Sequence, residues 1–156
     1  MELFDLWKFL HIAAMFAAVS VFVGQGLLEG VVARSGDVRA LRRVLTAEEP
    51  FGPIGGVLFL LGVGFGVVTA LSGSMDMTQP WLLIGYALAA VVLIIAFTYH
   101  IPTANKLKAL ADASPDDAPS PELRAAIEAP TGRIVNVVDG LVWLALIFDM
   151  VAKPFS

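Results

Sequence analysis

Four long apolar stretches, separated by polar connections, constrain this chain more than any other feature of its sequence. They cover about residues 6–30, 54–71, 81–100 and 133–152. A helix of roughly 20 apolar residues crosses a bilayer core of about 30 Å, so each stretch is long enough to span it. A helix also satisfies its own backbone hydrogen bonds in hydrocarbon. The sequence therefore predicts an all-α, polytopic membrane protein, an up-down bundle of four transmembrane helices.

The composition agrees with this reading and limits the chemistry. Of the 156 residues, 58% are hydrophobic and 15% are charged, and none is cysteine. Four spans and their connections use nearly the whole chain, so we expect one transmembrane domain, residues 1–156, with the lipid bilayer around it. A chain without cysteine has no thiolate metal site, no iron–sulfur cluster and no covalently attached haem. The net charge of −4 gives no indication of a nucleic-acid partner.

A short amphipathic helix is predicted in the connection between the first two spans. Apolar residues recur there at helical spacing, while arginines occupy the other faces. The apolar set is Val38, Leu41, Val44 and Leu45, and the arginines are Arg39, Arg42 and Arg43. Such a helix lies in the headgroup region of a membrane.

The positions of lysine and arginine predict the orientation of the chain. Basic residues gather in the first connection (Arg34, Arg39, Arg42, Arg43) and in the third (Lys106, Lys108, Arg124, Arg133), and the second connection has none. Connections rich in lysine and arginine stay in the cytoplasm. We therefore expect both termini to lie outside, an N-out and C-out topology.

Polar residues on the first and fourth spans predict two buried layers. Every third or fourth residue of the first helix falls on one face, which contains Lys8, His11, Met15, Ala18, Phe22, Gln25 and Glu29. Gln25 and Glu29 share the inner layer with Asn136 and Asp139, and Asp149 belongs to the outer layer. Ionisable groups in a span normally face the bundle interior. They either pair there or extend to the headgroups.

The two histidines allow a test of haem binding. At about 1.5 Å of rise per residue, His11 near the outer end of one span and His100 near the inner end of another differ in depth by roughly 20 Å. Two ligands of one metal must each lie within about 2 Å of it. One chain cannot bind a single haem through both, so His11 would need Met15, an exogenous ligand or the same histidine of a second subunit.

The second span carries glycines on one stripe. The stripe contains Gly52, Gly55, Phe59, Gly62, Gly66, Thr69 and Gly73. We expect Gly52, Gly55, Gly62 and Gly66 to be packing positions, because small residues let a neighbour approach the backbone closely in lipid. That neighbour is either another helix or a flat cofactor such as haem b.

The segment Leu6-Trp7-Lys8-Phe9-Leu10-His11-Ile12 resembles the LK-x-LH start of small bacterial four-helix membrane proteins, a predicted integral membrane family of unknown function. The likeness extends over Pro53 to Thr69 and the ending Pro102-x-x-x-Lys106-Leu107. More distantly the start is similar to copper-resistance D proteins and to HemJ-type protoporphyrinogen oxidases. The resemblance implies a bacterial inner membrane, and it associates His11 with metal or haem.

Three functions are compatible with these patterns. The favoured hypothesis is a noncatalytic membrane subunit or scaffold, with no catalytic residue, that packs with partner helices in a homo-oligomer or with other subunits. The alternative is a b-type haem or metal-binding redox protein using His11, with Met15 as a second ligand. A transporter using Glu29 and Asp139 is the third, although the middle of the predicted bundle is apolar, whereas an ion path needs polar groups throughout.

Overall fold

The computed structural model describes residues 2–154, and these fold into helices and connecting turns. In chain order the helices are α1 (Leu3–Ser35), α2 (Val38–Glu48), α3 (Phe51–Ser72), α4 (Pro80–Ile95), η1 (Ala96–His100), α5 (Ile101–Ala113), α6 (Pro121–Glu128) and α7 (Pro130–Ala152). Four helical stretches of this set are long and apolar enough to cross a membrane. The predicted all-α, multi-pass membrane fold is confirmed.

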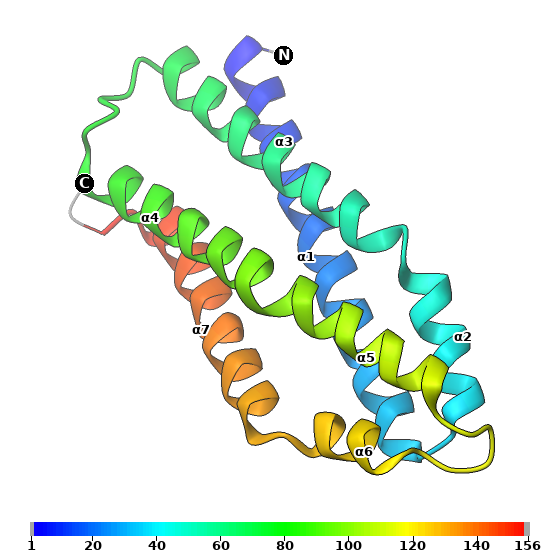
Figure 1. The fold of residues 1–156 in the computed structure, drawn as a ribbon. Helices are drawn as coiled ribbons and strands as arrows, with labels where there is room; N and C mark the ends of the chain where they lie inside the picture. Colours follow the sequence, from blue (N-terminus) through cyan, green and yellow to red (C-terminus); the bar gives the residue numbers. More distant parts are fainter. Residues whose placement is uncertain (1, 155–156) are drawn as a thin grey trace. The chain divides into compact units, whose positions relative to one another are not determined.

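The helices group into two compact units. The N-terminal unit contains residues 2–35 and 43–77, and the C-terminal unit contains residues 36–42 and 78–154. Each unit is built around one pair of long helices, α1 with α3 and α4 with α7. The members of each pair run in opposite directions (Figure 1).

The α1/α3 pair fits large side chains of one helix onto glycines of the other. Phe22 lies against Gly55, Met15 against Gly62, His11 against Gly66 and Phe4 against Gly73. The residue numbers rise along one helix as they fall along the other, as an antiparallel pair requires. The size relation inverts between the Phe22–Gly55 and Met15–Gly62 contacts, where α1 has the completely buried Ala18 and α3 has the large buried Phe59. Close packing of this kind holds helices together in lipid, where the hydrophobic effect between spans is weak.

The α4/α7 pair is also antiparallel. Gly85 of α4 faces Met150 and Asp149 near the end of α7, while Tyr99 lies against Gly132 near its beginning. At one end of the pair, the Lys153 ammonium lies 5.0 Å from the centroid of the Trp81 ring. This is a distance at which a cation is attracted to an aromatic face.

A π-helical turn, η1, joins α4 to α5 without interrupting the helix. The backbone N–H of Ile101 donates to the carbonyl of Ala96, five residues earlier. Pro102 explains the change of register, because it has no N–H for the carbonyl of Thr98, four residues before it. The helix of the third span therefore continues through η1 into α5 as far as Ala113, beyond the predicted end of the span near residue 100.

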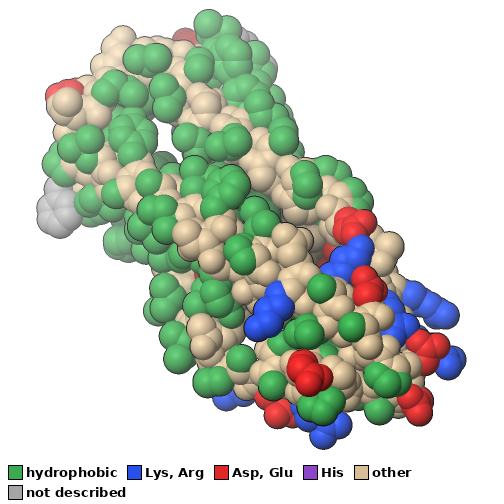
Figure 2. Space-filling view, viewed as in Figure 1, with side chains coloured by type: hydrophobic (Ala, Val, Ile, Leu, Met, Phe, Trp, Pro, Cys, Tyr) green, Lys and Arg blue, Asp and Glu red, His purple; other side chains and the backbone are tan. Residues whose placement is uncertain are grey.

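Apolar side chains cover much of the surface. Val151, Phe16 and Phe97 are 80%, 75% and 68% exposed. Figure 2 shows apolar side chains over most of the visible face of α4, whereas charged side chains gather near α5 and α6. A surface so rich in exposed large apolar groups needs a hydrocarbon surrounding. In α2, Val38, Leu41 and Leu45 are buried, in keeping with the predicted amphipathic helix.

Candidate functional site

His11 is held in a fixed orientation by a backbone group of α3. Its Nδ1 atom lies 2.7 Å from the carbonyl oxygen of Gly62. Because a carbonyl oxygen only accepts hydrogen bonds, Nδ1 carries the proton and donates it. In the neutral ring the lone pair is then on Nε2. His11 therefore fastens α1 to α3 with one nitrogen and keeps the other as a potential ligand.

The predicted packing glycines lie at unequal positions relative to α1. A Cβ added at Gly62 would lie 2.5 Å from Sδ of Met15, and one at Gly66 would lie 2.9 Å from Nδ1 of His11. At Gly55 it would lie 2.8 Å from the Phe22 ring. These are closer than normal carbon contacts, so α1 side chains already fill the space above three of the glycines. At Gly52 the added atom would meet nothing within 4 Å.

Met15 is turned into the helix contact. Its sulfur and Cγ are the atoms nearest to the position that a Cβ would take at Gly62. Since Met15 follows His11 by one helical turn, both side chains point from α1 toward α3. His11 contacts α3 through Nδ1, and Met15 contacts it through its sulfur and Cγ. Both predicted ligands are thus engaged in the α1/α3 contact, and Nε2 of His11 is the ring nitrogen that this contact does not use.

Gln25 and Glu29 lie on the half of α1 that faces α2. The Gln25 amide nitrogen donates to the backbone carbonyl of Glu48 over 3.1 Å. Glu29 is close enough to Glu48 for their charges to interact. Both are half-buried in the N-terminal unit. Sequence reasoning missed Glu48, because its position depends on how α2 folds back onto α1.

In the C-terminal unit, His100 and Asp139 approach each other. Nε2 of His100 lies 3.5 Å from Oδ2 of Asp139, which is long for a hydrogen bond. The same nitrogen is buried without a hydrogen-bond partner. Asn136, one turn earlier on α7, is exposed. The predicted inner layer thus has a half-buried Asp139 next to a histidine and an exposed Asn136.

Asp149 is the most deeply buried charged side chain of the described residues, at 2% exposure. Neither carboxylate oxygen has a hydrogen-bond partner. Its neighbour across the helix pair is Gly85, where an added Cβ would lie 3.2 Å from Oδ2. An unpaired carboxyl group in such a place is costly to bury.

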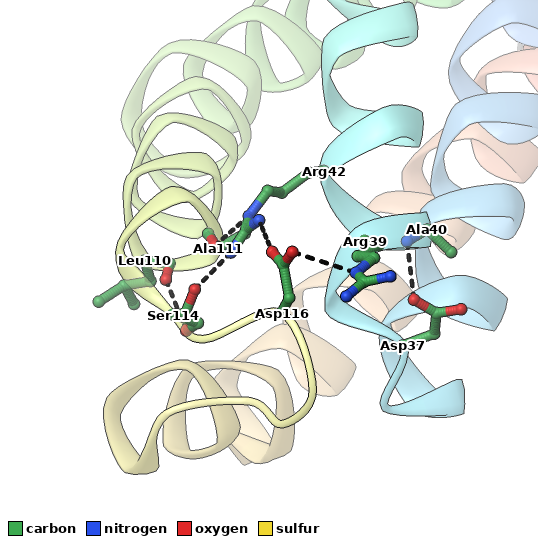
Figure 3. A network of polar contacts seen from close by, with 8 residues as sticks. All are labelled: Asp37, Arg39, Ala40, Arg42, Leu110, Ala111, Ser114 and Asp116. Carbon is green, nitrogen blue, oxygen red and sulfur yellow. Dashed lines mark hydrogen bonds and ion pairs between the residues drawn. The ribbon is translucent and has the colours of Figure 1, made fainter.

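A polar network at the charged end of the C-terminal unit joins three segments (Figure 3). Arg42 donates from Nε to the carbonyl oxygen of Ala111 over 2.7 Å. Its two terminal nitrogens donate to the backbone carbonyl oxygen of Ser114 and to Oδ1 of Asp116. Arg39 lies 3.1 Å from the other Asp116 oxygen. The hydrogen bond from Arg42, aided by the charges of both arginines, lowers the pKa of Asp116.

This network brings together the first and third connections of the chain. The beginning of α2 belongs to the first, and Ser114 and Asp116 belong to the third. Contact between them places both arginine-bearing connections on the same side of any membrane that the chain crosses. The sequence predicted that placement from charge, but it did not predict the role of the acidic loop, which supplies Asp116.

Comparisons with family models, with curated proteins and with solved structures give no match. Within residues 2–154, no three histidine, cysteine, aspartate or glutamate side chains gather where they could hold a metal ion. The function is therefore argued from the geometry of the two units alone.

Proposed function

We propose that this chain is a noncatalytic membrane subunit or scaffold that packs with partner helices. One observation carries the proposal. The residues that could have held a cofactor on the glycine stripe are used in the α1/α3 contact, with Met15 over Gly62 and the His11 ring over Gly66. At Gly55, Gly62, Gly66 and Gly73 the clearance that glycine provides is filled by side chains of α1, so this part of the stripe works as a helix-packing surface.

A second small surface of α3 is open for a partner. Cβ atoms added at Gly52 or Gly56 would meet nothing within 4 Å. Gly52 and Gly56 lie one turn apart, and pairs with this spacing bring membrane helices close together. The partner for this surface is therefore a membrane helix, either of a second copy of this chain or of another subunit.

Association of tagged and untagged copies in mild detergent tests this proposal. We expect the wild type to be recovered in a complex of fixed mass, and Gly52→Leu with Gly56→Leu to release it. Gly64→Leu is the matched control. Gly64 is equally open, but the residues one turn away are the large Leu60 and Val68, so it forms no pair of small residues. Wild-type chain recovered alone, or equal loss in both variants, would contradict the proposal.

The proposal includes an orientation and a membrane. The arginine-rich first and third connections support cytoplasmic placement of both, with the termini outside. The resemblance of the first span to small bacterial proteins supports the inner membrane of a bacterium. A reporter that is active only in the cytoplasm, fused after Ser156, should stay inactive, and an active fusion would reverse the assignment.

A b-type haem or metal-binding role for His11 is the second candidate, and one contact favours it. Histidines that bind metals usually donate their other ring N–H to a carbonyl or carboxylate, as Nδ1 of His11 does to Gly62. Nε2 would be the ligand, and bound haem would supply one-electron chemistry. Any further protein or exogenous ligand would come from Met15, from His11 of another copy or from a small molecule.

Absorption spectra of protein expressed with haem available distinguish the two candidates. The haem role predicts a Soret band that His11→Ala removes and that His100→Ala leaves. A colourless wild-type preparation would reject haem and leave the scaffold role standing. A band that persists in His11→Ala would reject His11 as the ligand.

A further inference from the structure

A groove in the N-terminal unit has features of a ligand site that the packing role does not use. It has a volume of about 610 Å³ and lies between α1, the end of α2 and the beginning of α3. This falls within the range of small-molecule sites, about 300–1,000 Å³. Its apolar wall includes Val21, Leu28, Val44 and Phe51. Such a wall suits a hydrocarbon chain.

One part of the groove wall carries negative charge. Glu48 lines the groove, and its Oε1 is buried without a hydrogen-bond partner. Glu29 adds a second carboxylate close enough to repel it. Gln25, also in the wall, uses its amide nitrogen for the backbone carbonyl of Glu48 and not for the carboxylate. A cationic group that donates hydrogen bonds would relieve this concentration of negative charge.

A positive group lies in the same wall. Arg43 lines the groove, and it belongs to the basic face of α2 that the sequence places in the headgroup region. Arginine matches phosphate oxygens with two parallel hydrogen bonds. The groove therefore combines an apolar surface, a phosphate-binding cation and a pair of carboxylates.

We propose that this groove binds one phospholipid with a primary ammonium in its headgroup, a phosphatidylethanolamine. Its acyl chain lies along the apolar wall, its phosphate contacts Arg43, and its ammonium contacts the Glu48 carboxylate. A phosphatidylglycerol has no cation for Glu48. A phosphatidylcholine has a cation without N–H donors, so it cannot hydrogen-bond the Glu48 carboxylate. The charge pattern thus selects ethanolamine among common headgroups.

Two glycines of α1 give a matched test of the groove itself. Gly24 and Gly26 both have nothing within 4 Å of an added Cβ, but Gly24 lines the groove and Gly26 does not. Gly24→Leu would fill the groove with a side chain, whereas Gly26→Leu would add the same group elsewhere. Delipidated protein is mixed in detergent with phosphatidylethanolamine, phosphatidylglycerol or phosphatidylcholine, and bound lipid is counted by native mass spectrometry.

The wild type should retain one phosphatidylethanolamine, Gly26→Leu should match it, and Gly24→Leu should lose it. Glu48→Gln keeps the backbone carbonyl that Gln25 binds, so it tests the carboxylate without removing that contact. A charged hydrogen bond is worth enough for Glu48→Gln to weaken ethanolamine lipid about tenfold, with little change for phosphatidylglycerol. Glu49→Gln, at an exposed neighbouring position, should have no effect.

Arg43→Gln should weaken all three lipids, since each has a phosphate, whereas Arg34→Gln outside the groove should not. Equal binding of the three lipids by the wild type would reject headgroup recognition. Preference for phosphatidylglycerol would reject the role of Glu48. Full binding by Gly24→Leu would reject the groove as the site. None of these outcomes bears on Gly52 and Gly56, so the packing proposal is tested separately.

Discussion

Replacing Gly62 by alanine tests whether the α1/α3 pair depends on the fit between single residues. The added Cβ would lie 2.5 Å from Sδ, 2.9 Å from Cγ and 3.3 Å from the backbone nitrogen of Met15. The two nearest atoms belong to the Met15 side chain, so that side chain must move. Overpacking a filled site costs about 1–3 kcal/mol. Methionine adapts readily, so we expect a loss in the lower half of that range.

The partner variant makes the argument quantitative. Met15→Ala alone removes a packed side chain, and because Met15 is half-buried, it should cost about 2 kcal/mol, the lower end of the range for buried methionines. In the double variant the new Cβ occupies space that Met15 leaves, so the two losses should not add. We expect a coupling of about 0.5–3 kcal/mol in favour of the double variant, measured by unfolding in mixed detergent micelles containing increasing sodium dodecyl sulfate.

Gly64→Ala is the control, because an added Cβ there meets nothing within 4 Å. Alanine is the better helix former by about 1 kcal/mol, so this variant should be no less stable than the wild type. If Gly62→Ala is as stable as Gly64→Ala, Met15 does not pack tightly against Gly62. If the losses of stability in Gly62→Ala and Met15→Ala simply add in the double variant, the two residues are not in contact.

Three further changes examine the polar network, the register of the α1/α3 pair and the α4/α7 pair. Asp116→Asn removes a carboxylate whose pKa Arg42 lowers. The stability that this carboxylate contributes is complete above the ordinary aspartate pKa of about 3.9, and it is lost as the pH falls through the lower pKa of the folded state. The difference in Tm between wild type and variant should therefore shrink below about pH 4, and a constant difference would contradict the pairing. The sequence has no cysteine, so a short bifunctional thiol reagent would react only with introduced cysteines, and the cross-linked product can be detected on a gel. We expect Phe22→Cys with Gly55→Cys to be cross-linked, and Phe22→Cys with Gly73→Cys not to be. Asp149→Asn should raise resistance to sodium dodecyl sulfate by about 1–3 kcal/mol at pH 8, since a neutral amide is less costly to bury unpaired than a carboxylate; a lower stability would show that the carboxylate has a stabilising partner.

Hydropathy predicted the four spans but not the full lengths of their helices. The first helix runs from Leu3 to Ser35, beyond the predicted 6–30, and α7 begins at Pro130, ahead of residue 133. Apolar content marks the part of a helix that lies in hydrocarbon. The helix itself continues until a residue breaks it, as at Gly36, whose φ of 77° suits glycine.

Periodicity found the face of α3 that meets α1, but not how far the contact extends. Gly55, Gly62 and Gly66 lie under side chains of α1, whereas Gly52 does not. A helical stripe gives direction around an axis and cannot show where a partner helix stops. At the level of Gly52, the neighbouring Gln25 turns toward α2 and binds the carbonyl of Glu48.

The polar contacts were the least predictable part. Arg42 and Asp116 are far apart in the sequence, and their pairing depends on where α5 ends. A charge count placed their two connections on one side of the membrane but gave no residue pair. Likewise, His11 was identified as a candidate ligand, while its bond to Gly62 required the register of the two helices.

The division of large and small residues between α1 and α3 restricts which helices can pair. Two copies of α1 would place Met15 and Phe22 against side chains of similar size, and two copies of α3 would leave gaps above their glycines. The pair is therefore selective for one helix of each kind, within a chain or by exchange between chains. The facing positions should also covary among related sequences, so that a larger residue at 62 is accompanied by a smaller one at 15, and likewise at 55 and 22.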